Sequence, residues 1–98
     1  MALTPAQVDS LRKLGTDARR ADIKGQADRR LAELDLRTLM APDPADPNKP
    51  RDLARIETKV REIEKLRADG RVAQIMSLEQ SRQVLTPEQR EKLRSLLS

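Results

Sequence analysis

Residues 85–93 of the chain read Leu-Thr-Pro-Glu-Gln-Arg-Glu-Lys-Leu, and residues 3–11 read Leu-Thr-Pro-Ala-Gln-Val-Asp-Ser-Leu. Both segments follow the pattern Leu-Thr-Pro-x-Gln-x-x-x-Leu, then continue with Arg at the next place and Leu two places further on. The motif residues are Leu3, Thr4, Pro5 and Gln7 in the first copy and Leu85, Thr86, Pro87 and Gln89 in the second. The copies agree at seven of twelve places, which is hard to assign to chance in a chain of 98 residues.

The repeat has the chemistry of a helix start. A threonine at the N-cap accepts a hydrogen bond from a free backbone N–H, and proline suits the first helical position because the N–H that it lacks would have no partner there. A glutamine at the third helical position can reach back to the cap and complete a capping box. In the first copy Leu3 and Val8 stand where a hydrophobic staple would form, whereas Arg90 takes the place of Val8 in the second copy. We therefore predict that a helix begins at each copy.

A proline-rich segment separates two long apolar patterns. Residues 41–50 hold four of the six prolines, and no helix survives that spacing because each proline removes a backbone donor and restricts its predecessor. On either side, apolar residues recur at steps of three and four, which indicates one face of a helix. This stripe comprises Val8, Leu11, Leu14, Ala18, Ala21, Leu31, Leu34 or Asp35, and Leu39 in the first arm, and Leu53, Ile56, Val60, Ile63, Leu66, Gly70, Val72, Ile75, Leu78 and Leu85 in the second.

The predicted elements are a helix over about residues 4–41, a proline-rich turn over 42–50, a helix over about 51–84 and a short helix over about 87–97. Gly15 and Gly25 interrupt the first arm, each at a cost of about 1 kcal/mol relative to alanine. The first arm is therefore either one continuous helix or a short helix joined to a longer one near Gly15. The layout is an elongated antiparallel hairpin, with both motif copies expected at its open end.

Composition supports a single all-α domain with a thin core. The chain has no Phe, Tyr or Trp, and its charged and apolar residues each make up 37%. Such a chain can cover one face of each helix and little more, so we expect a homodimer of hairpins. The candidate dimer or partner surface comprises Leu53, Ile56, Val60, Ile63, Ile75 and Met76.

The residue types argue against several classes of function. Without His, Cys or Tyr the chain lacks the common catalytic bases and nucleophiles, so we predict a non-enzyme without a cofactor. The net charge of +4 is spread evenly and no aromatic platform exists, which argues against nucleic-acid binding. No apolar run is long enough for stable membrane insertion. We also predict no metal site, because Met40 and Met76 suit core packing and the two carboxylates of Asp43 and Asp46 make a weak cation site.

Paired Leu-Thr-x-x-Gln (LTxxQ) motifs at the two ends of a small, charged, helical chain resemble the Spy/CpxP family of periplasmic chaperones. The related zinc- and heavy-metal-resistance proteins of the bacterial envelope share these motifs. The resemblance implies an ATP-independent chaperone or stress-response protein that binds unfolded or partner proteins on an amphipathic helical surface. It also implies a periplasmic location, with an export signal or membrane anchor removed ahead of Met1-Ala2, since no signal peptide is recognisable there.

Two alternative functions remain open at the level of sequence. One is the periplasmic sensor domain of a heavy-metal-resistance signalling system, in which dimer geometry passes a signal to a membrane-bound partner. Metal-sensing relatives use His among their ligands, and this chain has none. The other alternative is a structural helical adaptor.

Overall fold

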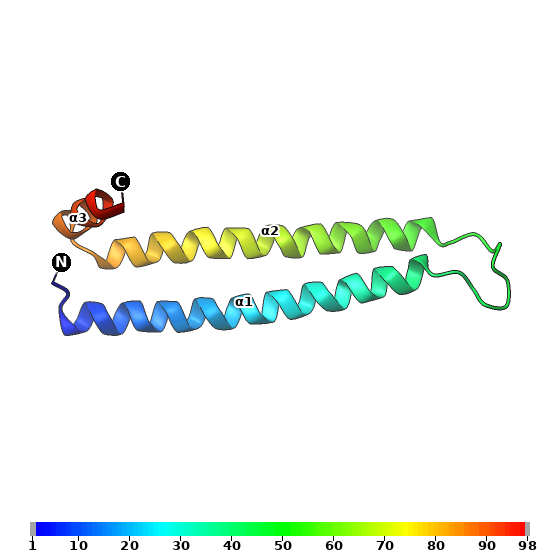
Figure 1. Ribbon diagram of the computed structural model, residues 1–98, viewed down its shortest axis with the longest axis horizontal. Coiled ribbons are helices and arrows are strands. Elements are labelled where there is room, and N and C mark those ends of the chain that lie inside the picture. The colour runs from blue at the N-terminus through cyan, green and yellow to red at the C-terminus, as the bar shows by residue number, and fades with distance from the viewer. Residues whose placement is uncertain (1, 98) are drawn as a thin grey trace. The chain divides into compact units, whose positions relative to one another are not determined.

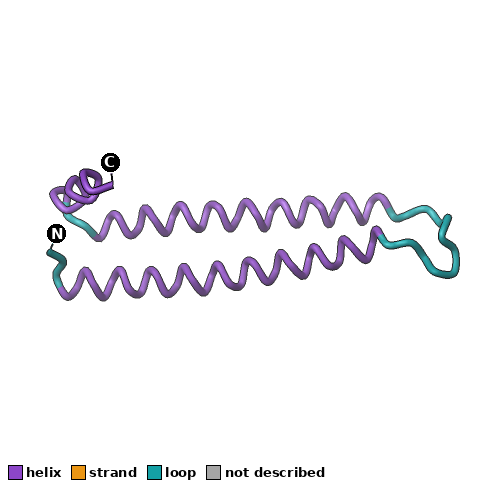
Figure 2. Tube along the Cα trace, viewed as in Figure 1, coloured by secondary structure: helices purple, strands orange, loops and turns teal. Residues whose placement is uncertain are grey.

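The computed structural model describes residues 2–97, and these form three helices (Figures 1 and 2). The helices are α1 (Pro5–Met40), α2 (Leu53–Val84) and α3 (Pro87–Leu97). Within the described part no strand is present, and one isolated bridge joins Asp43 to Asp46 in the connecting segment. The two long helices run antiparallel, as the colour gradient of Figure 1 shows. The predicted all-α hairpin with a short C-terminal helix is therefore confirmed.

Helix α1 is continuous through both of its glycines. Gly15 and Gly25 lie inside the helix, and neither adopts a positive φ. The arm is therefore not split near Gly15, because the residues on both sides of each glycine sustain the backbone hydrogen bonds of the helix.

Replacing Gly15 by alanine is expected to raise the free energy of unfolding by about 0.5–1 kcal/mol. The gain arises because alanine loses less backbone freedom on folding, and a Cβ at Gly15 would meet no atom within 4 Å. Urea unfolding followed by circular dichroism measures the change, with Gly15→Val as the comparison, because a β-branched residue should recover less of the gain. A loss of stability in Gly15→Ala would show that this position needs glycine.

The chain divides into two compact units, which are described separately. Unit 1 comprises the described residues of Met1–Asp22 and Val72–Ser98, and unit 2 comprises Ile23–Arg71. In each unit a stretch of α1 lies against a stretch of α2, and α3 belongs to unit 1.

Unit 2 is centred on Ala32 and Ile63, each only 3% exposed. The ends of its helices are capped by nearby polar groups. The Asp52 carboxylate accepts a hydrogen bond from the backbone N–H of Arg55 (3.1 Å) at the start of α2, and the Arg51 side chain donates to the carbonyl of Met40 (3.2 Å) at the end of α1. These contacts fix where the proline-rich connection begins and ends.

The seam of unit 2, where α1 and α2 face each other, differs from the apolar stripe predicted for α1. Leu31 and Leu34 were expected to face α2, but they are 61% and 52% exposed, and Ala32 is buried instead. The inward positions Gly25, Ala32 and Leu39 lie seven residues apart, which is the repeat of a coiled-coil seam. Two of these inward positions therefore hold the small residues Gly25 and Ala32, while Leu31 and Leu34 remain outside.

Unit 1 has a thinner core. Among the described residues of this unit, Leu85 (8% exposed) is the one buried hydrophobic side chain. Its half-buried neighbours along the chain and across the seam include Leu3, Leu11, Leu14, Ala18, Val84 and Leu93. Val8 was expected on the seam but is 36% exposed, so that expectation is corrected. It lies one residue beyond Gln7, which takes the inward position.

Candidate functional site

Both predicted capping boxes are present in unit 1. In the first copy the Thr4 hydroxyl accepts a hydrogen bond from the backbone N–H of Gln7 (3.1 Å), and Gln7 Oε1 accepts one from the backbone N–H of Thr4 (2.9 Å). In the second copy the corresponding distances between Thr86 and Gln89 are 3.2 and 2.8 Å. The motif therefore starts α1 and α3 by the same local mechanism.

The two motif copies also bind each other through their glutamine side chains. Gln7 Nε2 donates to Gln89 Oε1 (2.7 Å) and to the carbonyl of Val84 (3.0 Å). In turn, Gln89 Nε2 donates to Gln7 Oε1 (3.2 Å) and to the carbonyl of Ala2 (2.7 Å). Ala2 and Val84 each directly precede a motif copy, so every contact occurs twice with equivalent partners. We call Gln7, Gln89 and the carbonyls of Ala2 and Val84 the amide clip.

The amide clip satisfies both glutamines completely. Each Nε2 uses its two N–H donors, and each Oε1 accepts one bond from its own cap and one from the other glutamine. The repeat predicted the two caps, but nothing in the local sequence indicated that the glutamine of one copy would bind the other. Only the antiparallel return of the chain brings the copies together.

Helix α3 turns Gln89, Arg90 and Leu93 inward, where they are half-buried. Arg90 stands at the place that Val8 holds in the first copy, and its Nε is buried without a hydrogen-bond partner among the described residues. A buried polar atom without a partner costs about 1–3 kcal/mol. The contact between α3 and the rest of unit 1 therefore combines a fully satisfied clip with one unfavourable group.

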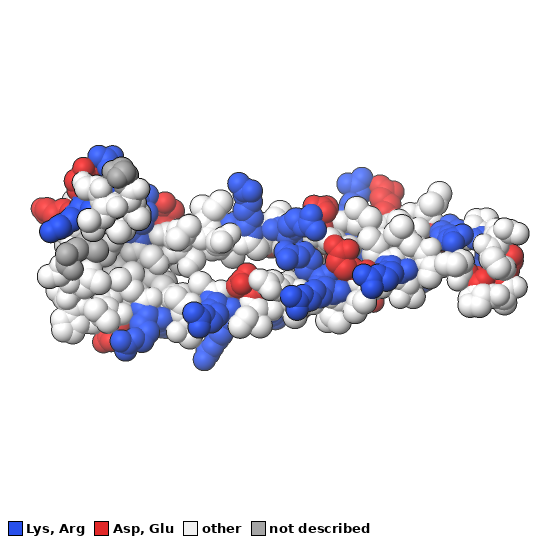
Figure 3. Space-filling view, viewed as in Figure 1, with Lys and Arg blue, Asp and Glu red and all other residues white. Residues whose placement is uncertain are grey.

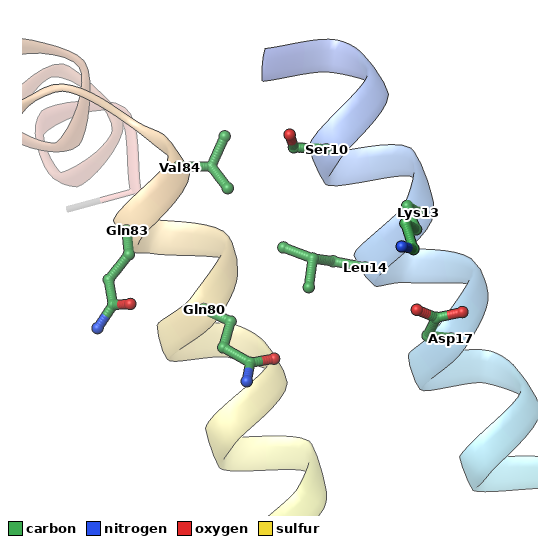
Figure 4. Close-up of a pocket in the computed structure, with 7 residues that line it drawn as sticks. All are labelled: Ser10, Lys13, Leu14, Asp17, Gln80, Gln83 and Val84. Carbon is green, nitrogen blue, oxygen red and sulfur yellow. The ribbon is translucent and has the colours of Figure 1, made fainter. Parts of the chain in front are cut away.

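A groove of about 500 Å³ lies beside the amide clip in unit 1, and we call it the side groove (Figure 4). Leu14 of α1 and Val84 of α2 point toward each other across it. Polar side chains surround this apolar centre, namely Ser10, Lys13, Asp17, Gln80 and Gln83. The lining carries one positive and one negative charge, so it is neutral overall.

Large apolar side chains are exposed on both units. Of the predicted partner surface, Leu53 (76%), Val60 (41%), Ile75 (51%) and Met76 (55%) are exposed. Ile56 is half-buried, and Ile63 is buried in the core of unit 2, so it is not accessible to a partner. The structure thus leaves four of these six residues open to a partner.

A second apolar surface on α1 was not among the predicted site residues. Ile23, Ala27, Leu31 and Leu34 are spaced by three or four residues, so they share one face of the helix. We call these four residues the outer stripe; Ile23 is 62% exposed. The exposed basic residues Lys24, Arg30 and Arg37 lie along the same stretch of helix. Figure 3 shows basic side chains interspersed with uncharged surface on the face that it draws.

Lys59 joins the two helices of unit 2. Its Nζ lies 2.7 Å from Glu62 Oε2 and 3.5 Å from Asp35 Oδ2 of α1, and its side chain is only 21% exposed. The hydrogen bond to Glu62 raises the pKa of Lys59 above its ordinary value, with partial desolvation acting in the opposite direction and the charge of Asp35 adding to the rise. A groove of about 600 Å³ lies beside this cluster. The cluster ties α1 to α2 by charge.

Among residues 2–97, no group of three or more His, Cys, Asp or Glu side chains is placed to hold a metal ion. No helix in that range combines the length and the apolar character needed to cross a membrane. Comparison with family models, with curated proteins and with solved structures finds no match for this chain.

Proposed function

We propose that this chain is an ATP-independent chaperone-like protein of the Spy/CpxP type, which binds unfolded or partner polypeptides on the exposed apolar faces of its long helices. The observation that carries the proposal is that small residues of α1 face α2 in unit 2 while two neighbouring leucines are exposed. Gly25 and Ala32 occupy the seam, whereas Leu31 and Leu34 stand outside it. Contiguous apolar patches on a monomer commonly mark a binding surface, and the shared helix face of the outer stripe provides such a patch.

The amount of exposed surface agrees with a binding role. The chain exposes 8216 Å², whereas a compact monomer of its mass is expected to expose about 5,700 Å². The difference is roughly 2,500 Å², and a standard interface covers only about 800 Å² on each partner. A homodimer could therefore form and still leave surface for a client.

The chemistry of the outer stripe suits loose binding of unfolded chains. Leu31 and Leu34 offer apolar contact, which supplies most of the binding energy. The flexible basic side chains of Arg30 and Arg37 attract acidic segments and speed the encounter. A surface without deep pockets selects for general apolar character rather than one sequence, as a chaperone requires. The two LTxxQ motifs add the family resemblance, and with it a periplasmic location.

The proposal is tested by suppression of aggregation of a chemically denatured client at stoichiometric amounts. We expect the unsubstituted chain to suppress aggregation, and the double variant Leu31→Asn with Leu34→Asn to lose at least about two thirds of that effect. Ala68→Asn, at an exposed place on α2, provides the control and should behave like the unsubstituted chain. Circular dichroism checks that each variant remains helical, and sedimentation determines whether the chain is a dimer. No suppression by the unsubstituted chain would refute the chaperone proposal.

A further inference from the structure

Helix α3 is joined to the rest of unit 1 by few attachments. Only Leu85 and Thr86 separate the end of α2 from the start of α3. With 11 residues, α3 is too short to be a stable helix on its own, so its order depends on docking. The polar part of that docking is the amide clip, in which Gln89 contacts Gln7 and Ala2.

The docked position of α3 is balanced by an unfavourable group. The three hydrogen bonds that Gln89 makes with Gln7 and Ala2 favour it. The buried Nε of Arg90 opposes it, because this atom has no protein partner when α3 is docked and would regain water when α3 is released. The equivalent place in the first copy is Val8, which carries no such cost. Local release of short, weakly docked elements is a general property of folded proteins.

Release of α3 would change the side groove. Val84 belongs to both features, because its carbonyl accepts the hydrogen bond from Gln7 and its side chain forms part of the groove. Leu85 follows directly and is 8% exposed, and Leu93 of α3 is half-buried. Undocking α3 would carry Leu93 away and uncover Leu85, which would extend the apolar surface that begins at Leu14 and Val84.

We propose that α3 is a detachable strap, whose release enlarges the side groove into a binding surface for a neutral, apolar segment of unfolded polypeptide. The occupant follows from the lining. Gln80, Gln83 and Ser10 offer donors and acceptors to a peptide backbone, and Lys13 and Asp17 balance in charge. This inference rests on the proposed function. It adds that client binding at the side groove is regulated, because the groove stays small while α3 is docked.

The variant Gln89→Glu in the full chain tests the strap. A glutamate can still accept the cap hydrogen bond from Thr86, but it has no N–H to donate to Ala2 and Gln7, and it places a carboxylate beside their oxygens. We expect backbone amides of α3 to exchange with solvent at least about tenfold faster, while those of α1 and α2 change little. We also expect a permanently unfolded, neutral client to bind at least about threefold more tightly. Gln74→Glu, at an exposed place on α2, is the matched control for charge.

A second variant should act in the opposite direction. Arg90→Val removes the unpartnered atom and installs the residue type of the first copy, so it should slow exchange in α3 and weaken client binding severalfold. Unchanged exchange in both variants would overturn the strap, and faster exchange without tighter binding would overturn its role at the groove. If no form of the chain binds the client, the proposed function fails together with that role, while the exchange data separately decide whether α3 opens.

Discussion

Replacing Ile63 by alanine is expected to lower the free energy of unfolding by about 3 kcal/mol. Ile63 is 3% exposed and shares the centre of unit 2 with Ala32, which is too small to fill the space that the substitution would leave. The half-buried Ile56 and Leu66 on the same helix could relax toward it only in part. The loss is large for a chain of this size, because few other side chains are buried. Urea denaturation followed by circular dichroism measures it.

Val60→Ala is the matched control for Ile63→Ala. Val60 lies three residues earlier on α2 and is 41% exposed, so its replacement should cost about 1 kcal/mol or less. If the two substitutions cost the same, Val60 must be buried in solution by a contact with another chain. Dependence of the Val60→Ala effect on protein concentration would then identify that contact as the homodimer.

Replacing Gln7 or Gln89 by alanine is expected to cost about 2 kcal/mol in each case. Each substitution removes one cap interaction, worth about 1 kcal/mol. It also removes hydrogen bonds between the copies, which contribute about 1 kcal/mol net. The double variant should cost roughly 1 kcal/mol less than the sum of the two, because Gln7 and Gln89 share two of these bonds.

A double-mutant cycle of urea unfolding measures this coupling. Gln74→Ala is the control, since Gln74 is exposed on α2 and should change stability by less than about 0.5 kcal/mol. Strict additivity of Gln7→Ala and Gln89→Ala would mean that the two side chains do not interact in solution, and the amide clip would then be reduced to two independent caps.

The helices were predictable because their signals are local. Thr86 and Pro87 act within one turn of α3, and the prolines of residues 41–50 exclude helix without reference to the rest of the chain. The seam was harder to predict, because an apolar repeat of 3.5 residues drifts by about 20° per heptad relative to a straight helix. Over the length of α1 this drift decides whether Leu31 or Ala32 faces α2, and residue size alone favoured the wrong one.

The polar interior was beyond sequence reasoning for a different reason. Lys59 and Gln7 take inward positions that a hydrophobicity pattern assigns to apolar residues. Lys59 can do so because its apolar stem packs in the seam while its ammonium reaches Glu62 and Asp35. Gln7 can do so because Gln89, a residue 82 positions away, completes its hydrogen bonds. Such partners become visible only once the chain is folded.

The amide clip also acts as a cross-link in a protein without cysteine. It joins residues 82 positions apart in the folded state, although it does not restrict the unfolded chain as a disulfide does. Unlike a disulfide, it forms equally well in oxidising and reducing surroundings, and its side-chain amides carry no proton that titrates near neutral pH. Neither redox state nor mild acid therefore supplies a signal for opening it. For the strap that we propose, competition for these hydrogen bonds by the peptide groups of an unfolded polypeptide is a trigger that their chemistry allows.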